Sequence, residues 1–224
     1  IFFDDKSTDQ SLKVVKKFKR IKLIKNQKKI NKSKPLNQIN AIINCYKKSK
    51  GKIIFLLDSD DYFNKKKLSI IVKKFIDDDK LEFLQDIPVF SDNNKNYYLR
   101  KKIHFFSIWP RFYPTSTIAI KRKFFKKFIE KIEKNKYPNL EIDARLCIYA
   151  FLKNKFKIIN KKLTFYNSGP QGISSNYSKF SKNWWKKRNE AYQYMFGLMK
   201  KFKISIVKGP DYYLTQIINK FINQ

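Results

Sequence analysis

The stretch that decides the fold is residues 51–68, GKIIFLLDSDDYFNKKKL. Its apolar run, residues 53–57, predicts a central parallel strand that helices cover on both faces. Three carboxylates, Asp58, Asp60 and Asp61, follow this run directly. In open α/β sheets, ligands bind at the carboxyl ends of the strands. We therefore expect a ligand site at these aspartates.

The segments around this stretch alternate between strand and helix. Apolar periodicity and helix stop signals predict strands at 1–3, 21–24, 53–57 and 82–84, and helices at 12–18, 35–50 and 65–75. A βαβαβ order of this kind indicates an α/β fold with a doubly wound, mostly parallel sheet flanked by helices.

The sequence pattern of the second half of the chain predicts a polar connecting segment, further helices and two short strands. Pro88 is expected to break the polar segment 86–98. The remaining elements are helices at 122–132 and 143–152, paired short strands at 156–159 and 163–166, and helices at 182–202 and 211–222. We expect one α/β domain over residues 1–175 and a C-terminal helical extension over residues 176–224. The chain begins without Met inside an apolar run, so we expect a fragment whose domain lacks its first strand and helix.

The chain is strongly basic, with 51 Lys and Arg against 18 Asp and Glu and a formal charge of +33. Such a surface attracts anionic lipid headgroups and phosphorylated ligands. The alternative explanation of the high Lys content is a general bias towards Lys codons. The basic residues are spread along the chain, so a specific nucleic-acid partner is not expected. Neither a signal peptide nor a membrane span is visible, and the two cysteines suit a reducing compartment. These features predict a cytoplasmic protein, peripheral at the inner face of the membrane.

The carboxylates after residue 57 need a counter-charge, because like charges this close repel each other. Mg²⁺ or Mn²⁺ fits, since such ions typically bind one or two carboxylates together with nucleotide phosphates. The alternative is that Asp60 or Asp61 only caps the next helix.

A second carboxylate pair, Asp4-Asp5, follows the first strand and precedes Ser7-Thr8-Asp9. It is either a capping arrangement for the next helix or a contact to a nucleotide base or ribose.

The strings FFDDKSTDQS (residues 2–11) and GKIIFLLDSDDYFNKKKL resemble, in the same order, the DDGSTD and LDxDD segments of family 2 glycosyltransferases. The resemblance covers residues 1–68 well and residues 114–174 more loosely, and Lys6 replaces the family's Gly. It implies a GT-A fold and transfer of a sugar from a nucleotide-diphosphate donor.

The resemblance also implies roles for the aspartates. Asp4 and Asp5 would contact the nucleotide base, Asp58 the ribose, and Asp60 an Mg²⁺ or Mn²⁺ ion on the diphosphate. Asp61 has either a site role or a capping role. The acceptor expected of such a family is a glycan or a lipid-linked glycan in surface glycan synthesis.

The segment 139–145 resembles the family motif that carries the general base of inverting members. Asp143 is the candidate base, and Glu141 is the second choice. A base of this kind removes a proton from the acceptor hydroxyl as its oxygen attacks the anomeric carbon. The alternative for Asp143 is an N-cap of its own helix.

Weaker signals complete the sequence interpretation. Trp184-Trp185 predicts one core residue and one surface residue, segment 109–117 predicts part of an acceptor cleft, and Gln38 is among the candidate donor contacts. His104 is assigned no role. The rival functions are a basic nucleic-acid-binding protein and a nucleotidyltransferase on a similar fold.

Overall fold

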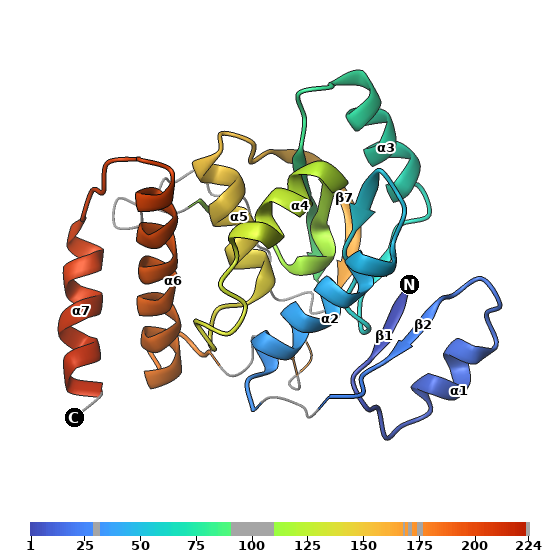
Figure 1. Ribbon diagram of the computed structural model, residues 1–224, viewed down its shortest axis with the longest axis horizontal. Helices are drawn as coiled ribbons and strands as arrows, with labels where there is room; N and C mark the ends of the chain where they lie inside the picture. Colours follow the sequence, from blue (N-terminus) through green and yellow to red (C-terminus); the bar gives the residue numbers. More distant parts are fainter. Residues whose placement is uncertain (29–31, 91–109, 168, 170–171, 174–176, 223–224) are drawn as a thin grey trace.

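A computed structural model describes residues 1–28, 32–90, 110–167, 169, 172–173 and 177–222 (Figure 1). Its strands are β1 Phe2–Asp4, β2 Leu23–Lys25, β3 Ile53–Phe55, β4 Tyr62–Phe63, β5 Phe83–Phe90, β6 Ile118–Lys121 and β7 Ile158–Tyr166. Its helices are α1 Ser11–Lys16, α2 Lys34–Lys48, α3 Lys67–Asp77, α4 Arg122–Lys131, α5 Ile142–Leu152, α6 Lys182–Lys201 and α7 Pro210–Ile222, with a 3₁₀ turn, η1, at Thr115–Thr117.

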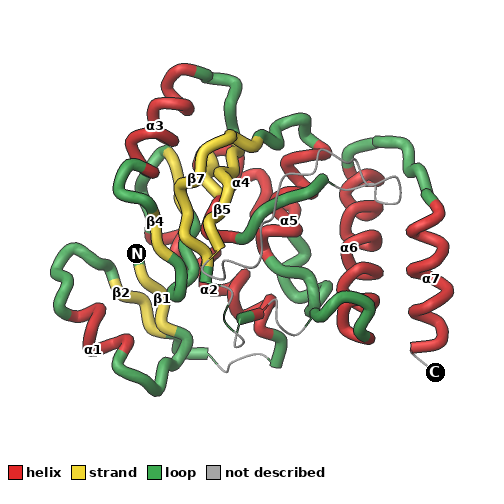
Figure 2. The backbone as a smooth tube through the Cα atoms, turned by 180° about the vertical axis from the view of Figure 1, so that it is seen from behind, coloured by secondary structure: helices red, strands yellow, loops and turns green. Residues whose placement is uncertain are grey.

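The strands form two sheets of mixed direction. β1 and β2 pair in parallel and lie side by side in Figure 2. A second sheet has the order β3-β6-β5-β7-β4. In the second sheet only β5 and β7 are parallel, whereas β3–β6, β5–β6 and β4–β7 are antiparallel. The expected α/β class with C-terminal helices is confirmed. The pairing differs from a mostly parallel sheet, because β6 runs antiparallel to both of its neighbours, β3 and β5, and β4 runs antiparallel to β7.

The five-stranded sheet lies between two helical layers. Ile118 and Ile120 of β6 face a core shared with α2, α4, α5 and α6, whereas Ala119 faces a second core under α3. This alternation is the period-2 pattern of a strand with both faces covered. β6 is fully buried at these three positions, so this interior strand, rather than the apolar run at 53–57, is covered on both faces.

β3 itself is an edge strand of the second sheet, which corrects the expectation of a central parallel strand. It ends at Phe55 and its one sheet neighbour is β6. Leu56 is buried, but Leu57 is 51% exposed. The run therefore leaves the sheet two residues before the aspartates, and the loop that carries them begins at Leu56.

Two further expectations about strands were wrong. β5 continues through Pro88 to Phe90, because the ladder with β7 shifts register between Ile87 and Pro88 and so accommodates a residue without an N–H. The two short strands expected at 156–166 are one strand, β7. Its polar central residues, 160–162, are exposed where the register with β5 is irregular.

The last two helices differ in how they pack. α6 contributes Tyr194, Met195 and Leu198 to the main core, so it is continuous with the α/β layers. α7 lies along α6 at the end of the molecule opposite β1 and β2 (Figures 1 and 2). Within the described ranges, no helix has the length and apolar character needed to cross a bilayer.

Candidate functional site

Asp58 is held at the end of β3 by groups from α2 and η1. Its backbone N–H donates to Ser116 Oγ over 2.9 Å, and Gln38 Nε2 donates to its Oδ1 over 3.1 Å. The same Gln38 amide reaches Thr115 Oγ1 over 3.3 Å. Burial, with smaller contributions from Asp61 and Asp60, raises the pKa of Asp58 to about 6 despite the Gln38 hydrogen bond. This carboxyl is therefore oriented, and its charge is poorly compensated.

Asp60 and Asp61 point into different surroundings. Asp60 is exposed, whereas Asp61 is buried and its Oδ1 accepts a hydrogen bond from the Asn167 N–H over 2.8 Å. The other oxygen of Asp61 is buried with no hydrogen-bond partner in the described parts of the chain. Burial, followed at a smaller scale by the charge of Asp60, raises the pKa of Asp61.

The capping alternative for Asp60 and Asp61 is wrong. The residue that caps α3 is Lys66, with no side-chain capping bond, and the turn before it is closed by Asn64 Oδ1, which accepts from the Lys66 N–H. Asp61 instead ties the β3–β4 loop to the segment after β7.

A buried ion pair lies next to the loop that carries the three aspartates. Lys67 Nζ lies 2.7 Å from Asp86 Oδ1, and both side chains are fully buried. Lys67 also donates to the Ser116 carbonyl over 2.7 Å, and the Thr164 hydroxyl donates to Asp86 Oδ2 over 2.7 Å. Burial lowers the pKa of Lys67 and raises that of Asp86, while each partner opposes the shift of the other. Through these bonds the pair joins α3, β5, β7 and η1.

Asp4 and Asp5 are anchored within the β1–β2 unit. Asp4 is buried and accepts from the Ser7 N–H over 3.1 Å. The Asn26 side chain, just after β2, donates to Asp5, and its N–H donates to the Asp4 carbonyl over 2.8 Å. Neither Asp4 nor Asp5 caps α1: its N-cap, Gln10, makes no side-chain capping bond, and the carboxylate at this helix start is that of Asp9, which accepts from the Ser11 N–H over 2.9 Å. β1 packs against α2, but no hydrogen bond among the described residues joins Asp4 or Asp5 to Asp58.

Asp143 lies in the first turn of α5 with its side chain partly exposed. It is not the N-cap, which is Glu141; its Oδ1 accepts from the Ala144 N–H over 2.6 Å. Burial raises the pKa of Asp143 to about 7, the charge of Glu141 adds to this, Lys187 opposes it, and Asp58 contributes a smaller rise. The influence of Asp58 brings the strand-end and helix-start carboxylates into one electrostatic environment.

Glu141 differs from Asp143 in having a cationic partner. Its Oε1 lies 2.6 Å from Lys187 Nζ of α6, and the Glu141 side chain is buried. The Lys187 ammonium also lies 4.6 Å from the centroid of the Tyr177 ring. Because Lys187 occupies the Glu141 carboxylate and Asp143 has no such ion pair among the described residues, Asp143 is the better candidate of the two.

Arg145 fixes the loop that precedes α5. Its guanidinium is fully buried and donates to four backbone carbonyls, those of Glu133, Lys136, Tyr137 and Leu140. The distances range from 2.6 to 3.1 Å. The loop thereby holds one conformation at the point where α5 starts.

The other sequence signals fall in several places. Trp109 and His104 lie outside the described residues. Thr115 is buried behind Asp58 rather than facing an open cleft. Trp185 is buried and Trp184 half-buried, with their rings 4.6 Å apart, as expected of one core and one surface residue. Asn26 and Ser116 were not singled out by the sequence; for Asn26 the signal was its position directly after a strand.

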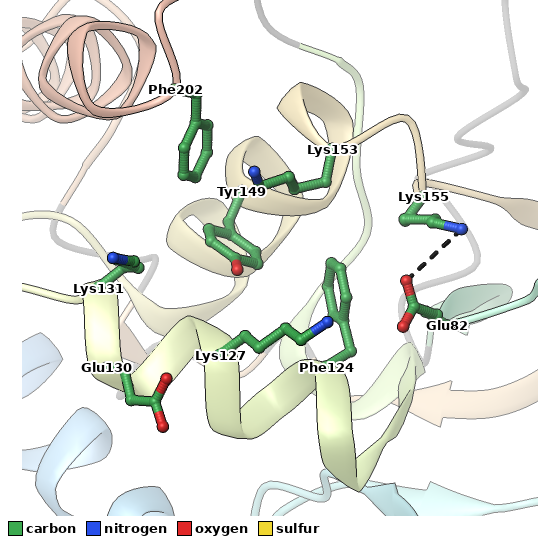
Figure 3. A pocket seen from close by; sticks show the side chains of 9 residues that line it. All are labelled: Glu82, Phe124, Lys127, Glu130, Lys131, Tyr149, Lys153, Lys155 and Phe202. Carbon is green, nitrogen blue, oxygen red and sulfur yellow. Dashed lines mark ion pairs between the residues drawn. The ribbon is translucent and has the colours of Figure 1, made fainter.

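A pocket of about 270 Å³ opens at the other end of α5 (Figure 3). It includes Tyr149, Lys153 and Phe202, and Lys155 pairs with Glu82 at its edge over 3.5 Å. From Asp143 to Lys153 the helix rises roughly 15 Å, at about 1.5 Å per residue. The pocket is thus separate from the carboxylates.

The layered α/β fold, with carboxylates following its strands and a helical end, defines a class of sugar-transferring domains. The family model "Glycosyl transferase family 2" matches residues 1–139, and the chain belongs to this family. No curated protein sequence matches the chain significantly.

Solved structures show the same fold at low sequence identity. The mannosyltransferase PcManGT from Pyrobaculum calidifontis, in complex with GDP-Man and Mn²⁺, is similar with a TM-score of 0.59 and 12% identity, over 94% of this chain and 56% of that one. Residues 1–349 of TarS from S. aureus, in complex with UDP-GlcNAc, are similar with a TM-score of 0.56 and 16% identity, over 86% and 56%. The GT-A fold is thereby confirmed. The chain spans just over half the length of these structures.

Proposed function

We propose that this protein transfers a sugar from a nucleotide-diphosphate donor to a hydroxyl group of a glycan or lipid-linked acceptor, with inversion at the anomeric carbon. One observation carries the proposal: the charge of Asp58 is among the groups that raise the pKa of Asp143, 85 residues farther along the sequence, so these two carboxyls lie near each other in the fold. A donor site and a proton acceptor are thus available in one place. The family membership supports the reaction class.

The donor would be held by the strand-end aspartates. Asp4 and Asp5 would bind the base, and Asp58, oriented by Gln38, would bind the ribose. The similar structures bind nucleotide sugars, UDP-GlcNAc in TarS and GDP-Man in PcManGT, which supports this class of donor.

Asp60 would hold an Mg²⁺ or Mn²⁺ ion together with the donor diphosphate. Its carboxylate is exposed and lies beside two carboxyls whose pKa values are raised, so a cation would relieve the crowded negative charge. Within the described ranges, no group of three metal-binding side chains is assembled. When bound, such an ion supplies Lewis-acid stabilisation of the leaving diphosphate.

Asp143 would act as the general base. Its carboxylate would take the proton of the acceptor hydroxyl while the oxygen forms its bond to the anomeric carbon and the bond to the diphosphate breaks. A pKa near 7 suits this role, because a base works best when its pKa lies near the working pH. Glu141 is occupied by its ion pair with Lys187, so Asp143 is the carboxylate assigned to take the proton.

The remaining parts of the proposal concern context. We place the start of the helical extension near residue 175, with α6 packed into the core of the transferase domain and α7 packed on α6. We place the protein at the inner face of a membrane, where a basic surface meets anionic lipids, and in surface glycan synthesis.

Thermal unfolding with UDP or GDP, with and without Mn²⁺, tests the donor site. One nucleotide should stabilise the wild type only with Mn²⁺, and Asp60→Ala should abolish this, whereas the exposed Asp77→Ala on α3 should retain it. Asp143→Asn should keep the stabilisation and lower sugar transfer by at least ~100-fold, as loss of a general base does. Nucleotide stabilisation that survives Asp60→Ala, or turnover that survives Asp143→Asn, would contradict the assigned roles.

A further inference from the structure

α7 turns its polar side towards the protein and its apolar side towards solvent. The residues it buries are Asp211, Thr215 and Asn219. Its exposed residues include Tyr213, Leu214, Ile217 and Phe221, which are 50–73% exposed. At 3.6 residues per turn, these four side chains and Lys220 share one stripe opposite the buried residues. An ordinary surface helix has the reverse arrangement.

Specific bonds to α6 hold this orientation. Asp211 is paired with Arg188 and accepts a hydrogen bond from the Tyr192 hydroxyl. Asn219 Nδ2 donates to the Trp185 carbonyl over 3.1 Å, and Gln216 Nε2 donates to Asn189 Oδ1 over 2.8 Å. Turning the apolar stripe inward would break these bonds and bury unpaired polar groups. The outward apolar stripe is therefore fixed by the polar contacts of the helix.

The charge around α7 is cationic. Residues 177–222 contain ten Lys and Arg and two acidic residues. Both acidic side chains are engaged, Glu190 with Asn139 over 2.6 Å and Asp211 with Arg188. Lys220 lies in the stripe itself, and no carboxylate accompanies it there. A symmetric contact with a second copy would bring two such stripes together with like charges and no compensating acid, which disfavours a dimer.

We propose that the outward stripe of α7 docks on an anionic lipid surface, with Tyr213, Leu214, Ile217 and Phe221 among the headgroups and Lys220 beside the lipid phosphates. An amphipathic helix with aromatic and aliphatic residues and flanking lysines suits such an interface. This inference rests on the membrane location in the proposed function and names the element that makes the contact. α7 lies at the end of the molecule opposite β1 and β2, so docking there leaves the β1 end of the chain free (Figures 1 and 2).

Vesicle flotation of the whole chain tests the proposal. The vesicles are phosphatidylcholine alone or phosphatidylcholine with about 30% phosphatidylglycerol, which mimics an anionic leaflet. The wild type should bind the mixed vesicles in preference to the neutral ones. The double variant Ile217→Ser/Phe221→Ser should bind at least ~10-fold more weakly, because two apolar side chains no longer leave water. Neither substitution changes charge, so electrostatic attraction alone cannot account for the loss.

The matched control is Phe18→Ser/Ile76→Ser, since these residues are 57% and 71% exposed away from α7, Phe18 after α1 and Ile76 on α3. It should bind like the wild type. Equal losses in both double variants, or no binding of the wild type to mixed vesicles, would overturn the proposal. So would light scattering that shows a wild-type dimer dissociated by the α7 substitutions, since a second copy would then cover the stripe. Thermal stabilisation by nucleotide, measured on the same samples, tests the donor site. The two measurements are independent, so a protein that binds no nucleotide can still bind the vesicles, and the reverse.

Discussion

Replacing Asp143 with Asn should make the protein more stable at pH 8 while removing its proposed base. Asn has the same shape, and its Oδ1 can accept the Ala144 N–H as the carboxylate does. The raised pKa means that the folded state holds the Asp143 proton more tightly than the unfolded chain does. As the pH rises from about 4 to 7, the charged carboxylate therefore lowers the stability of the folded state, and the loss is complete above pH 7.

The magnitude follows from the pKa. A change from 3.8 to about 7 corresponds to about 4 kcal/mol at pH 8 if nothing screened the charge. The side chain is partly exposed, so solvent screening reduces this to roughly 1–2 kcal/mol. For a chain of this size that is a rise in melting temperature of roughly 3–6 °C.

The assay is thermal unfolding of wild type and Asp143→Asn at pH 8 and pH 5. The gain in stability at pH 5 should be less than half the gain at pH 8. At pH 5 the carboxyl of the unfolded chain is mostly ionised, but only the pH interval from about 4 to 5 has yet lowered the stability of the wild type. Asp77→Asn, at an exposed position of α3, should change the melting temperature by less than about 1 °C at either pH. A variant that is destabilised at pH 8, or a gain independent of pH, would refute the claim that the site confines an uncompensated charge.

Two other predictions follow from the contacts around the site. Lys67→Met should lower the free energy of unfolding by about 3–5 kcal/mol in urea denaturation, because Asp86 would stay buried without its partner. The double variant Lys67→Met/Asp86→Leu should recover part of this stability. Additive losses from the two substitutions would contradict the pairing. Gln38→Ala should weaken nucleotide binding by about 3–10-fold in calorimetry, since one hydrogen bond orients Asp58. The control Asn44→Ala, farther along α2, should leave nucleotide binding unchanged. Equal effects of the two substitutions would show that Gln38 acts only through the stability of the helix.

The sequence predicted the helices well because their signals are local. The expected helices at 35–50 and 182–202 correspond to α2 and α6 within two residues at each end. Each starts at a serine whose hydroxyl accepts a backbone N–H three residues on, Ser33 and Ser181. The aspartates after residue 57 were also recognisable, because an apolar run that stops at a group of carboxylates is a contiguous pattern.

What the sequence could not predict depends on partners far along the chain. Lys67 is the last of three consecutive lysines, and nothing local marks it as the buried one that pairs with Asp86. Asp86 itself lies in a segment that Pro88 was expected to break. The antiparallel pairing of β3 with β6 depends on residues more than 60 positions apart. Side-chain periodicity reports which face is buried but not which strand lies alongside.

The bonds of Arg145 bear on how this protein can change over generations. The guanidinium holds carbonyl oxygens, which every residue type possesses, and it leaves the side chains of exposed loop residues such as Lys134 and Asn135 unused. Substitutions along that loop can therefore accumulate without moving the start of α5. A lineage could alter the exposed surface of that loop while Asp143 keeps its position, as long as this one arginine is retained.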